Sequence, residues 1–244
     1  MSEKPDTQDA EREAAQAADS ADAVELHESA GEELDESKSA PSDREAAGPF
    51  DAAEVPAMRP YVDLGGIKVA PREGLQLRLE VDERANRVVA VSLEYAESLL
   101  QLQAFAAPKT TGLWHGVRRE LTQQMAAQGA SAVEEDGPLG PELVVQTPVP
   151  AEQGGGTRAA RFVAVDGPRW MLRGVIMGKA ADDAAARERV IDLFREVVVV
   201  RGDQPMPPSE LLPLRVPAGV QAQRQDGAAA QVQAAAPEGG TQPA

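Results

Sequence analysis

Residues 161–177 read RFVAVDGPRWMLRGVIM, and they carry the clearest hairpin signal in the chain. Two largely apolar runs, 161–165 and 170–177, flank an Asp-Gly-Pro sequence at 166–168. Aspartate, glycine and proline favour tight turns because each suits a particular turn backbone. The stretch therefore predicts two antiparallel strands joined by a short turn.

A second hairpin is indicated earlier in the chain. Residues 75–81 place leucine or valine at every second position, which is the pattern of a half-buried strand. Turn residues at 82–86 separate this run from another apolar run at 87–95, so the two runs are expected to pair. Further strand candidates are residues 98–105, 130–133, 142–147 and 197–200.

Two segments have the periodicity of amphipathic helices. Apolar side chains recur every fourth residue from 113 to 125, which predicts a helix over 112–128 with Thr110 or Thr111 as its N-cap. A second helix is expected after Asp182 and Asp183, because acidic side chains favour a helix N-terminus. Runs of strands between single helices predict an α+β fold, a mainly antiparallel sheet packed with two amphipathic helices.

Charge is distributed unevenly along the chain. Residues 1–60 contain 17 acidic and 5 basic residues, whereas residues 61–217 contain 21 and 18. Nucleic-acid binders usually gather a basic excess, because neutralising phosphates supplies much of their affinity. Direct nucleic-acid binding is therefore disfavoured.

The composition also predicts where the folded domain lies. All eight aromatic residues fall between positions 50 and 194, so both ends of the chain lack the side chains that contribute most to a core. We expect a disordered acidic tail over 1–48, a single α+β domain over 49–217 and a disordered Ala/Gln/Gly/Pro tail over 218–244.

The absence of cysteine excludes disulfides, thiolate nucleophiles and cysteine-bound metals. No apolar run approaches the roughly 20 residues that span a bilayer, and no secretory signal follows the first residues. We expect a cytoplasmic protein without a membrane segment.

Few residues are suited to catalysis. His27 falls in the expected tail, and His115 lies off the apolar stripe of the first helix, so a surface histidine is expected rather than a general base. Acids at 134–136 and 182–183 offer oxygen ligands, so composition alone does not exclude a magnesium site, but solvated surface and helix capping account for both clusters better. We predict no catalytic residue, no cofactor and no metal site.

Three arginines form the candidate binding site. Arg169 and Arg173 share one side of their predicted strand, and Arg78 lies on another strand. On one sheet face the three would form an anion site, because arginine suits the paired oxygens of a phosphate or carboxylate. The alternative is an ordinary exposed face on which Arg78 pairs with an acid such as Glu80.

Three stretches carry a resemblance to a known family: residues 61–67 (YVDLGGI), 77–81 (LRLEV) and 166–174 (DGPRWMLRG). They are similar to an uncharacterised bacterial family catalogued as domain of unknown function 3710, from high-GC Gram-positive bacteria. The resemblance covers about residues 49–217. It implies one domain with variable ends and carries over no catalytic residue.

The lack of a convergent nucleophile, base or cofactor motif favours a non-enzymatic cytoplasmic binding or interaction domain, with an unknown protein as partner. An alternative is a small-molecule or nucleotide-phosphate site, with or without catalysis, on the arginine face. A third hypothesis is an accessory factor in nucleic-acid metabolism. A pocket lined by the arginines would favour the second, and an exposed groove bearing Met171, Val175 and Met177 would favour the first. Oligomeric state is not predicted.

Overall fold

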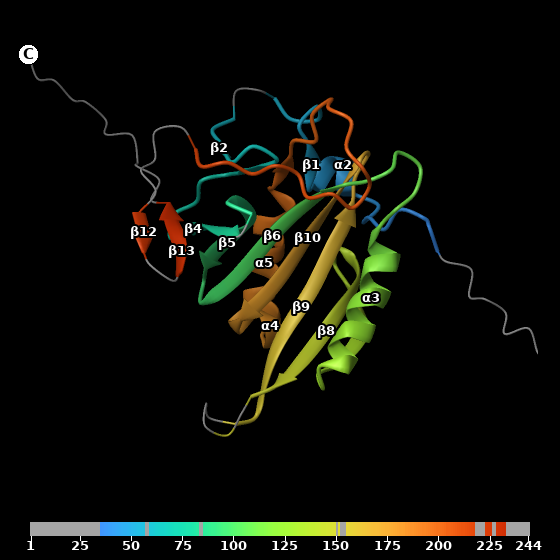
Figure 1. The fold of residues 1–244 in the computed structure, drawn as a ribbon, viewed down its shortest axis with the longest axis vertical. Coiled ribbons are helices and arrows are strands. Elements are labelled where there is room, and N and C mark those ends of the chain that lie inside the picture. The colour runs from blue at the N-terminus through green and yellow to red at the C-terminus, as the bar shows by residue number, and fades with distance from the viewer. Residues whose placement is uncertain are drawn as a thin grey trace, which may run out of the picture. The chain divides into compact units, whose positions relative to one another are not determined.

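A nine-stranded antiparallel sheet dominates the computed structural model (Figure 1). The structure describes residues 35–56, 59–82, 85–149, 151, 155–217, 223–225 and 228–232. In spatial order the strands of the large sheet are β12 (Gln223–Gln225), β13 (Ala228–Val232), β4 (Gln76–Asp82), β5 (Arg87–Tyr95), β6 (Ser98–Ala106), β10 (Trp170–Gly178), β9 (Thr157–Asp166), β8 (Gly140–Pro148) and β7 (Ser131–Gly137).

A smaller sheet joins segments that are far apart in the sequence. Its order is β1 (Phe50–Asp51), β11 (Val198–Val199), β3 (Ile67–Val69) and β2 (Val62–Asp63). The pair β1–β11 is parallel, and the other two pairs are antiparallel. This sheet therefore holds the start of the domain against the segment that follows the last helix.

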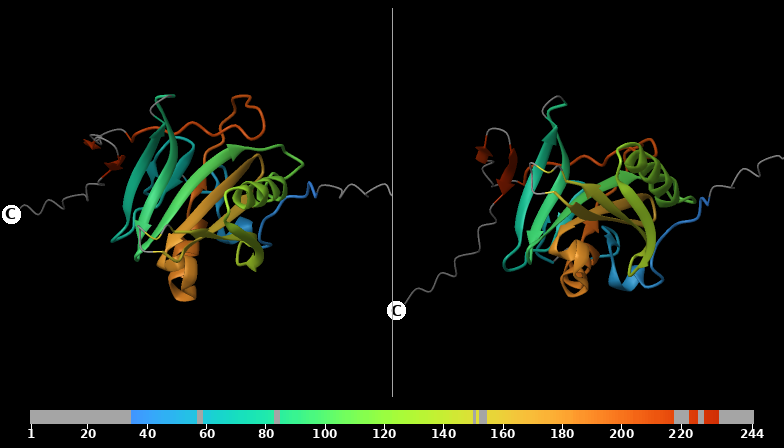
Figure 2. Two further views of the ribbon diagram at one scale, coloured as in Figure 1. Left: turned by 60° about the horizontal axis from the view of Figure 1, so that its bottom comes forward. Right: turned by 90° about the horizontal axis from the view of Figure 1, so that it is seen from below.

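Helices cover both faces of the large sheet. Helix α3 (Trp114–Ala127) lies on one face, while α4 (Lys179–Asp182) and α5 (Ala184–Arg195) lie on the other (Figure 2). A fourth helix, α2 (Arg44–Ala47), is a single turn. Within the described part of the chain, no helix is long and apolar enough to cross a membrane.

The main core lies between the sheet and α5. Leu100 and Leu102 of β6, Leu172 and Ile176 of β10 and Phe194 of α5 are buried together in one cluster. Burying each such side chain stabilises the fold by about 1.5–3 kcal/mol. Apolar side chains at alternate positions of β6 and β10 therefore form the sheet face on which α5 packs.

The other sheet face is divided into an apolar and a polar half. Beneath α3, the apolar half joins Trp114, Leu121, Leu143, Ala164 and Met171 in a second cluster. The polar half lies over β4, β5 and β6, where Arg78, Ser92 and Gln101 occupy one row across three strands. Ser92 and Gln101 both donate hydrogen bonds to the carboxylate of Glu80.

The structure confirms the α+β class and both predicted hairpins, now β4–β5 and β9–β10. The expected N-cap of the first helix is wrong, because α3 begins at Trp114 and neither Thr110 nor Thr111 caps it. The N-terminus of α3 is capped instead by the carboxylate of Asp166, which belongs to β9. At the second helix, Asp183 is the N-cap and accepts a 2.7 Å hydrogen bond from Ala186 N.

Residues 35–48 were assigned to the acidic tail in the sequence, and in the structure they pack on the sheet. Ser39 and Arg44 are buried. Lys38 donates hydrogen bonds to the carbonyl oxygens of Gly167 and Pro168. This segment therefore contributes to the hairpin turn that joins β9 to β10. Residues 1–34, the rest of the expected N-terminal tail, lie outside the described residues, as does most of 218–244.

Candidate functional site

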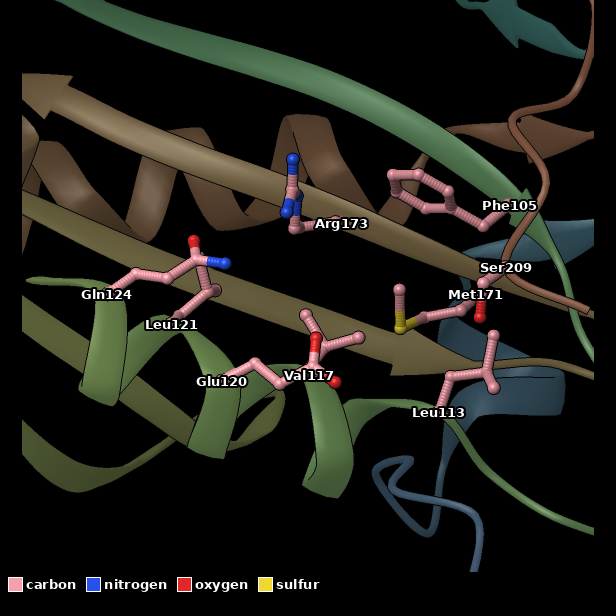
Figure 3. Close-up of a pocket in the computed structure, with 9 residues that line it drawn as sticks. All are labelled: Phe105, Leu113, Val117, Glu120, Leu121, Gln124, Met171, Arg173 and Ser209. Atoms are coloured by element: carbon pink, nitrogen blue, oxygen red, sulfur yellow. The ribbon is translucent and has the colours of Figure 1, made fainter.

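A pocket of 160 Å³ opens beside α3, where the apolar and polar halves of this sheet face meet (Figure 3). One wall is the inner side of α3, and the other is formed by β6 and β10 together with the C-terminal arm. The lining residues are Phe105, Leu113, Val117, Glu120, Leu121, Gln124, Met171, Arg173 and Ser209. The pocket therefore joins an apolar interior to a small number of polar groups, which is the usual composition of a ligand site.

Three contacts hold α3 in position to form the pocket. Asp166 accepts hydrogen bonds from the first N–H groups of the helix, at Leu113 and Trp114. The indole Nε1 of Trp114 donates a 2.6 Å hydrogen bond to the carbonyl of Pro141. Arg118 forms a 2.9 Å ion pair with Glu134 of β7. These contacts join α3 to β9, β8 and β7, while further side chains of the helix line the pocket.

Arg173 is the main charged group of the pocket. It lies in β10, directly opposite Gln103 of β6, and its Nη2 donates a hydrogen bond to the amide oxygen of that residue. Its guanidinium carbon lies 5.3 Å from the centre of the Phe105 ring. Arginine over an aromatic face is held by a cation–π attraction that keeps the group at the pocket wall.

Arg173 has no acidic partner among the described residues. Its Nε is buried, and no acceptor within the described part of the chain reaches it. Burial lowers the pKa of Arg173, because removing the guanidinium from water disfavours its charged form. A charge held in this way is open to an anion that enters the pocket.

The structure does not bring the other two predicted arginines to this pocket. Arg78 lies on the same sheet face as Arg173, but β5 and β6 separate their strands, a gap of about 14 Å at usual strand spacing. Arg78 is instead paired with Glu94 at 2.9 Å. Arg169 lies in the turn before β10 and donates to the carbonyl of Gly202.

The groups considered for catalysis or metal binding are placed elsewhere. His115 contacts Asp35 at 3.3 Å on the outer surface of α3. Glu134 and Glu135 form ion pairs with Arg118 and Arg161. Across the residues that the structure describes, no three acids or histidines are grouped to hold a metal ion.

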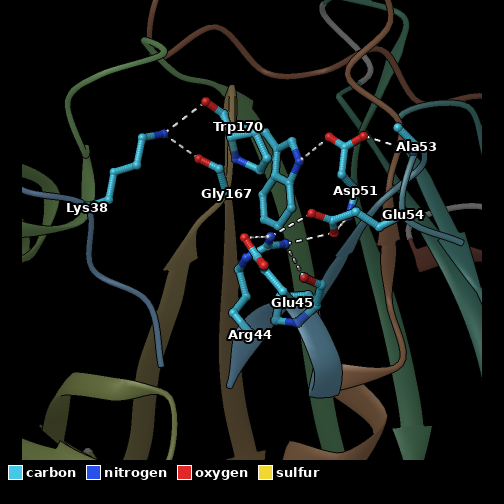
Figure 4. Close-up of polar contacts among 10 residues, drawn as sticks. Lys38, Arg44, Glu45, Asp51, Ala53, Glu54, Gly167 and Trp170 are labelled. Carbon is cyan, nitrogen blue, oxygen red and sulfur yellow. Dashed lines mark hydrogen bonds and ion pairs between the residues drawn. The ribbon is translucent and has the colours of Figure 1, made fainter. Parts of the chain in front are cut away.

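Close packing at the turn of the hairpin explains the start of the stretch 166–174. A Cβ atom on Gly167 would lie 2.2 Å from the ring of Trp170, so this turn has room only for glycine. Trp170 is buried, and its Nε1 donates a 2.8 Å hydrogen bond to Asp51 (Figure 4). The same stretch then supplies Met171 and Arg173 to the pocket.

A sheet with helices on both faces and an arginine in a largely apolar pocket defines an α+β domain with a candidate anion-binding site. The chain belongs to the family described as protein of unknown function DUF3710, which matches residues 48–223. The predicted family resemblance is therefore confirmed. No curated protein and no solved structure matches the chain.

Of the residues in this pocket, the sequence pointed to Arg173 as a candidate ligand group and to Met171 only as part of an exposed groove. Phe105 and Gln103 read as ordinary positions of an alternating strand, and Leu113 and Val117 as core positions of a helix. Met171, which was considered for an exposed apolar groove, is 1% exposed. The only local signal was the change to polar residues at alternate positions of β6, because Gln101 and Gln103 face away from the core.

Proposed function

We propose that this protein is a non-enzymatic cytoplasmic binding domain whose pocket holds a small carboxylate with an apolar body. The proposal retains a single α+β domain over 49–217 with two amphipathic helices, adds to it residues 35–48, which pack on the sheet, and keeps the expectation of disordered tails beyond it. The observation that carries it is the guanidinium of Arg173, which is withdrawn from water without an acidic partner among the described residues. A bound carboxylate would supply the missing charge through two parallel hydrogen bonds.

The composition of the pocket favours a carboxylate over a nucleotide phosphate. Among the described residues of the lining, Arg173 is the only one with a basic side chain, and Glu120 adds a negative charge that would repel a doubly charged phosphate. The volume of 160 Å³ is close to that of an apolar cavity which admits benzene, about 150 Å³. A nucleoside would not fit within such a space.

The pocket also favours binding over catalysis. The charged side chains among its described lining residues are Glu120, which is exposed, and Arg173, whose guanidinium has hydrogen-bond donors and no acceptor. Proton transfer needs a group whose protonation changes near the working pH, held within hydrogen-bond reach of the reacting atom. The lining supplies anchoring groups rather than such a pair.

Isothermal titration with 4-methylpentanoate tests the proposal. We expect saturable binding to the wild-type protein and a loss of about tenfold or more in affinity for Arg173→Met, because a hydrogen bond to a charged group contributes about 1.5–3 kcal/mol. Arg78→Met is the matched control, since Arg78 lies on the same sheet face outside the pocket lining. Equal binding by wild type and Arg173→Met would overturn the proposal.

The stability of the same variant separates binding from a structural role. Methionine keeps the apolar stem of the side chain and removes a charge that is costly to bury. In urea unfolding, we expect Arg173→Met to be unchanged or more stable by about 1 kcal/mol, as is common at binding sites. Destabilisation of about 2 kcal/mol would show instead that Arg173 maintains the fold.

A further inference from the structure

Glu120 supplies the pocket with a second charge, and it faces the same space as Arg173. Glu120 projects from α3, whereas Arg173 projects from β10, so the two charges come from the two walls of the pocket (Figure 3). They form no ion pair with each other, and Glu120 has no basic partner among the described residues. Two acids of β7 are paired, by contrast: Glu134 with Arg118 and Glu135 with Arg161.

We propose that the ligand is a free aliphatic α-amino acid in its zwitterionic form, an inference that rests on the proposed function. Its carboxylate binds Arg173, and its ammonium group faces Glu120. Its side chain packs against Val117, Leu121 and Met171. The juxtaposition of one cation, one anion and an apolar surface within a single pocket carries the inference.

Charge complementarity favours a zwitterion over singly charged ligands. A simple carboxylate would satisfy Arg173 and be repelled by Glu120, whereas an amine would satisfy Glu120 and be repelled by Arg173. The chain as a whole carries a net charge of −16, which disfavours the approach of anions. A zwitterion has no net charge, so this long-range repulsion does not act on it.

The apolar part of the pocket sets the size of the side chain. Five apolar residues line it, namely Phe105, Leu113, Val117, Leu121 and Met171. A volume of 160 Å³ suits a branched side chain of three or four carbons, comparable to the roughly 150 Å³ cavity that admits benzene. Leucine, isoleucine and valine therefore fit better than tryptophan.

Ser209 adds a polar group at the rim from a third element. Its φ of 64° is in the left-handed region, which is unfavourable for a residue with a side chain. The arm is held there because Ser209 N donates a 2.8 Å hydrogen bond to the carbonyl of Ala106, the last residue of β6. Ser209 thereby lines the pocket near Met171 and Leu113, where its hydroxyl is available to a polar group of a ligand (Figure 3).

Isothermal titration with matched ligands tests the inference on the full chain. The ligands are L-leucine, 4-methylpentanoate, which lacks only the amino group, L-leucinamide, which lacks the carboxylate, and N-acetyl-L-leucine, which imitates the end of a peptide. We expect L-leucine to bind at least roughly tenfold more tightly than the other three, because only leucine satisfies both charges.

The variant Glu120→Gln tests whether Glu120 binds the ammonium group of the ligand. This exposed substitution should remove the advantage of L-leucine over 4-methylpentanoate while leaving 4-methylpentanoate bound as tightly as before or more tightly. Glu188→Gln, which removes the same charge from the exposed side of α5, should leave all affinities unchanged.

The outcomes distinguish this inference from the proposed function. If 4-methylpentanoate or N-acetyl-L-leucine binds wild type as tightly as L-leucine and depends on Arg173, the amino-acid assignment is wrong and the carboxylate site stands. If leucine is preferred but Glu120→Gln preserves the preference, the ammonium site is wrong. If none of the four ligands binds, both proposals are overturned.

Discussion

The backbone N–H of Leu113 donates a 2.9 Å hydrogen bond to Oδ1 of Asp166, 53 residues further along the chain. Oδ2 of the same carboxylate accepts hydrogen bonds from the N–H groups of Ser39, at 3.0 Å, and Trp114, at 3.4 Å. Asp166 is 2% exposed. One buried carboxylate therefore joins the β9–β10 turn, the first turn of α3 and the segment that precedes α2.

Asp166→Ala should destabilise the protein strongly. The substitution leaves three N–H donors, two of them buried, without this acceptor and removes a negative charge from a helix N-terminus. We expect a loss of about 2–4 kcal/mol in the free energy of unfolding, measured by urea denaturation. Asp182→Ala, at an exposed aspartate, should change it by less than about 0.5 kcal/mol. Similar stability for both variants would contradict this role.

Two glycine-to-alanine substitutions should have opposite effects. Gly167→Ala places a Cβ 2.2 Å from the Trp170 ring, so we expect destabilisation by about 2 kcal/mol or more. Gly116 lies within α3 with nothing within 4 Å of the added atom, and Gly116→Ala should stabilise the protein by about 0.5–1 kcal/mol. Thermal unfolding of the two variants provides the comparison, and a shift in the same direction for both would contradict the packing described.

The ion pair between Arg44 and Glu54 should make stability dependent on pH (Figure 4). Burial opposes ionisation of Glu54, but hydrogen bonds from Arg44 and from Asp51 N outweigh it and lower the pKa of the carboxyl. Because the folded-state pKa lies below the unfolded value, the contribution is present above about pH 4.3 and is lost as the pH falls through the folded pKa.

Glu54→Gln provides the measurement for this pair. The difference in free energy of unfolding between wild type and Glu54→Gln should be constant from about pH 5 to 7 and should shrink below about pH 4. Glu45 is far more exposed, with a side chain that is 91% accessible, so Glu45→Gln serves as the control. A difference that grows on acidification would contradict the assignment.

Sequence patterns predicted the elements because the relevant forces act over a few residues. Alternation of apolar and polar side chains identified β4, and the Asp-Gly-Pro turn identified β9–β10. The N-cap of α3 was predicted wrongly because its capping group is distant in the sequence. Its capping group is not Thr110 or Thr111 nearby in the chain but Asp166, which only the folded sheet brings to the helix.

The sequence by itself determined an α+β domain, two hairpins, the membership of a family and one arginine of the candidate site. Tertiary structure decided which of two strand arginines, Arg78 or Arg173, has an acidic partner among the described residues. Arg78 and Arg173 occupy similar strand positions, yet pairing of β4 with β5 gives Arg78 a partner in Glu94, while pairing of β10 with β6 places Arg173 beside Gln103, 70 residues away. Strand register across such separations depends on packing of the whole sheet, which no local pattern encodes.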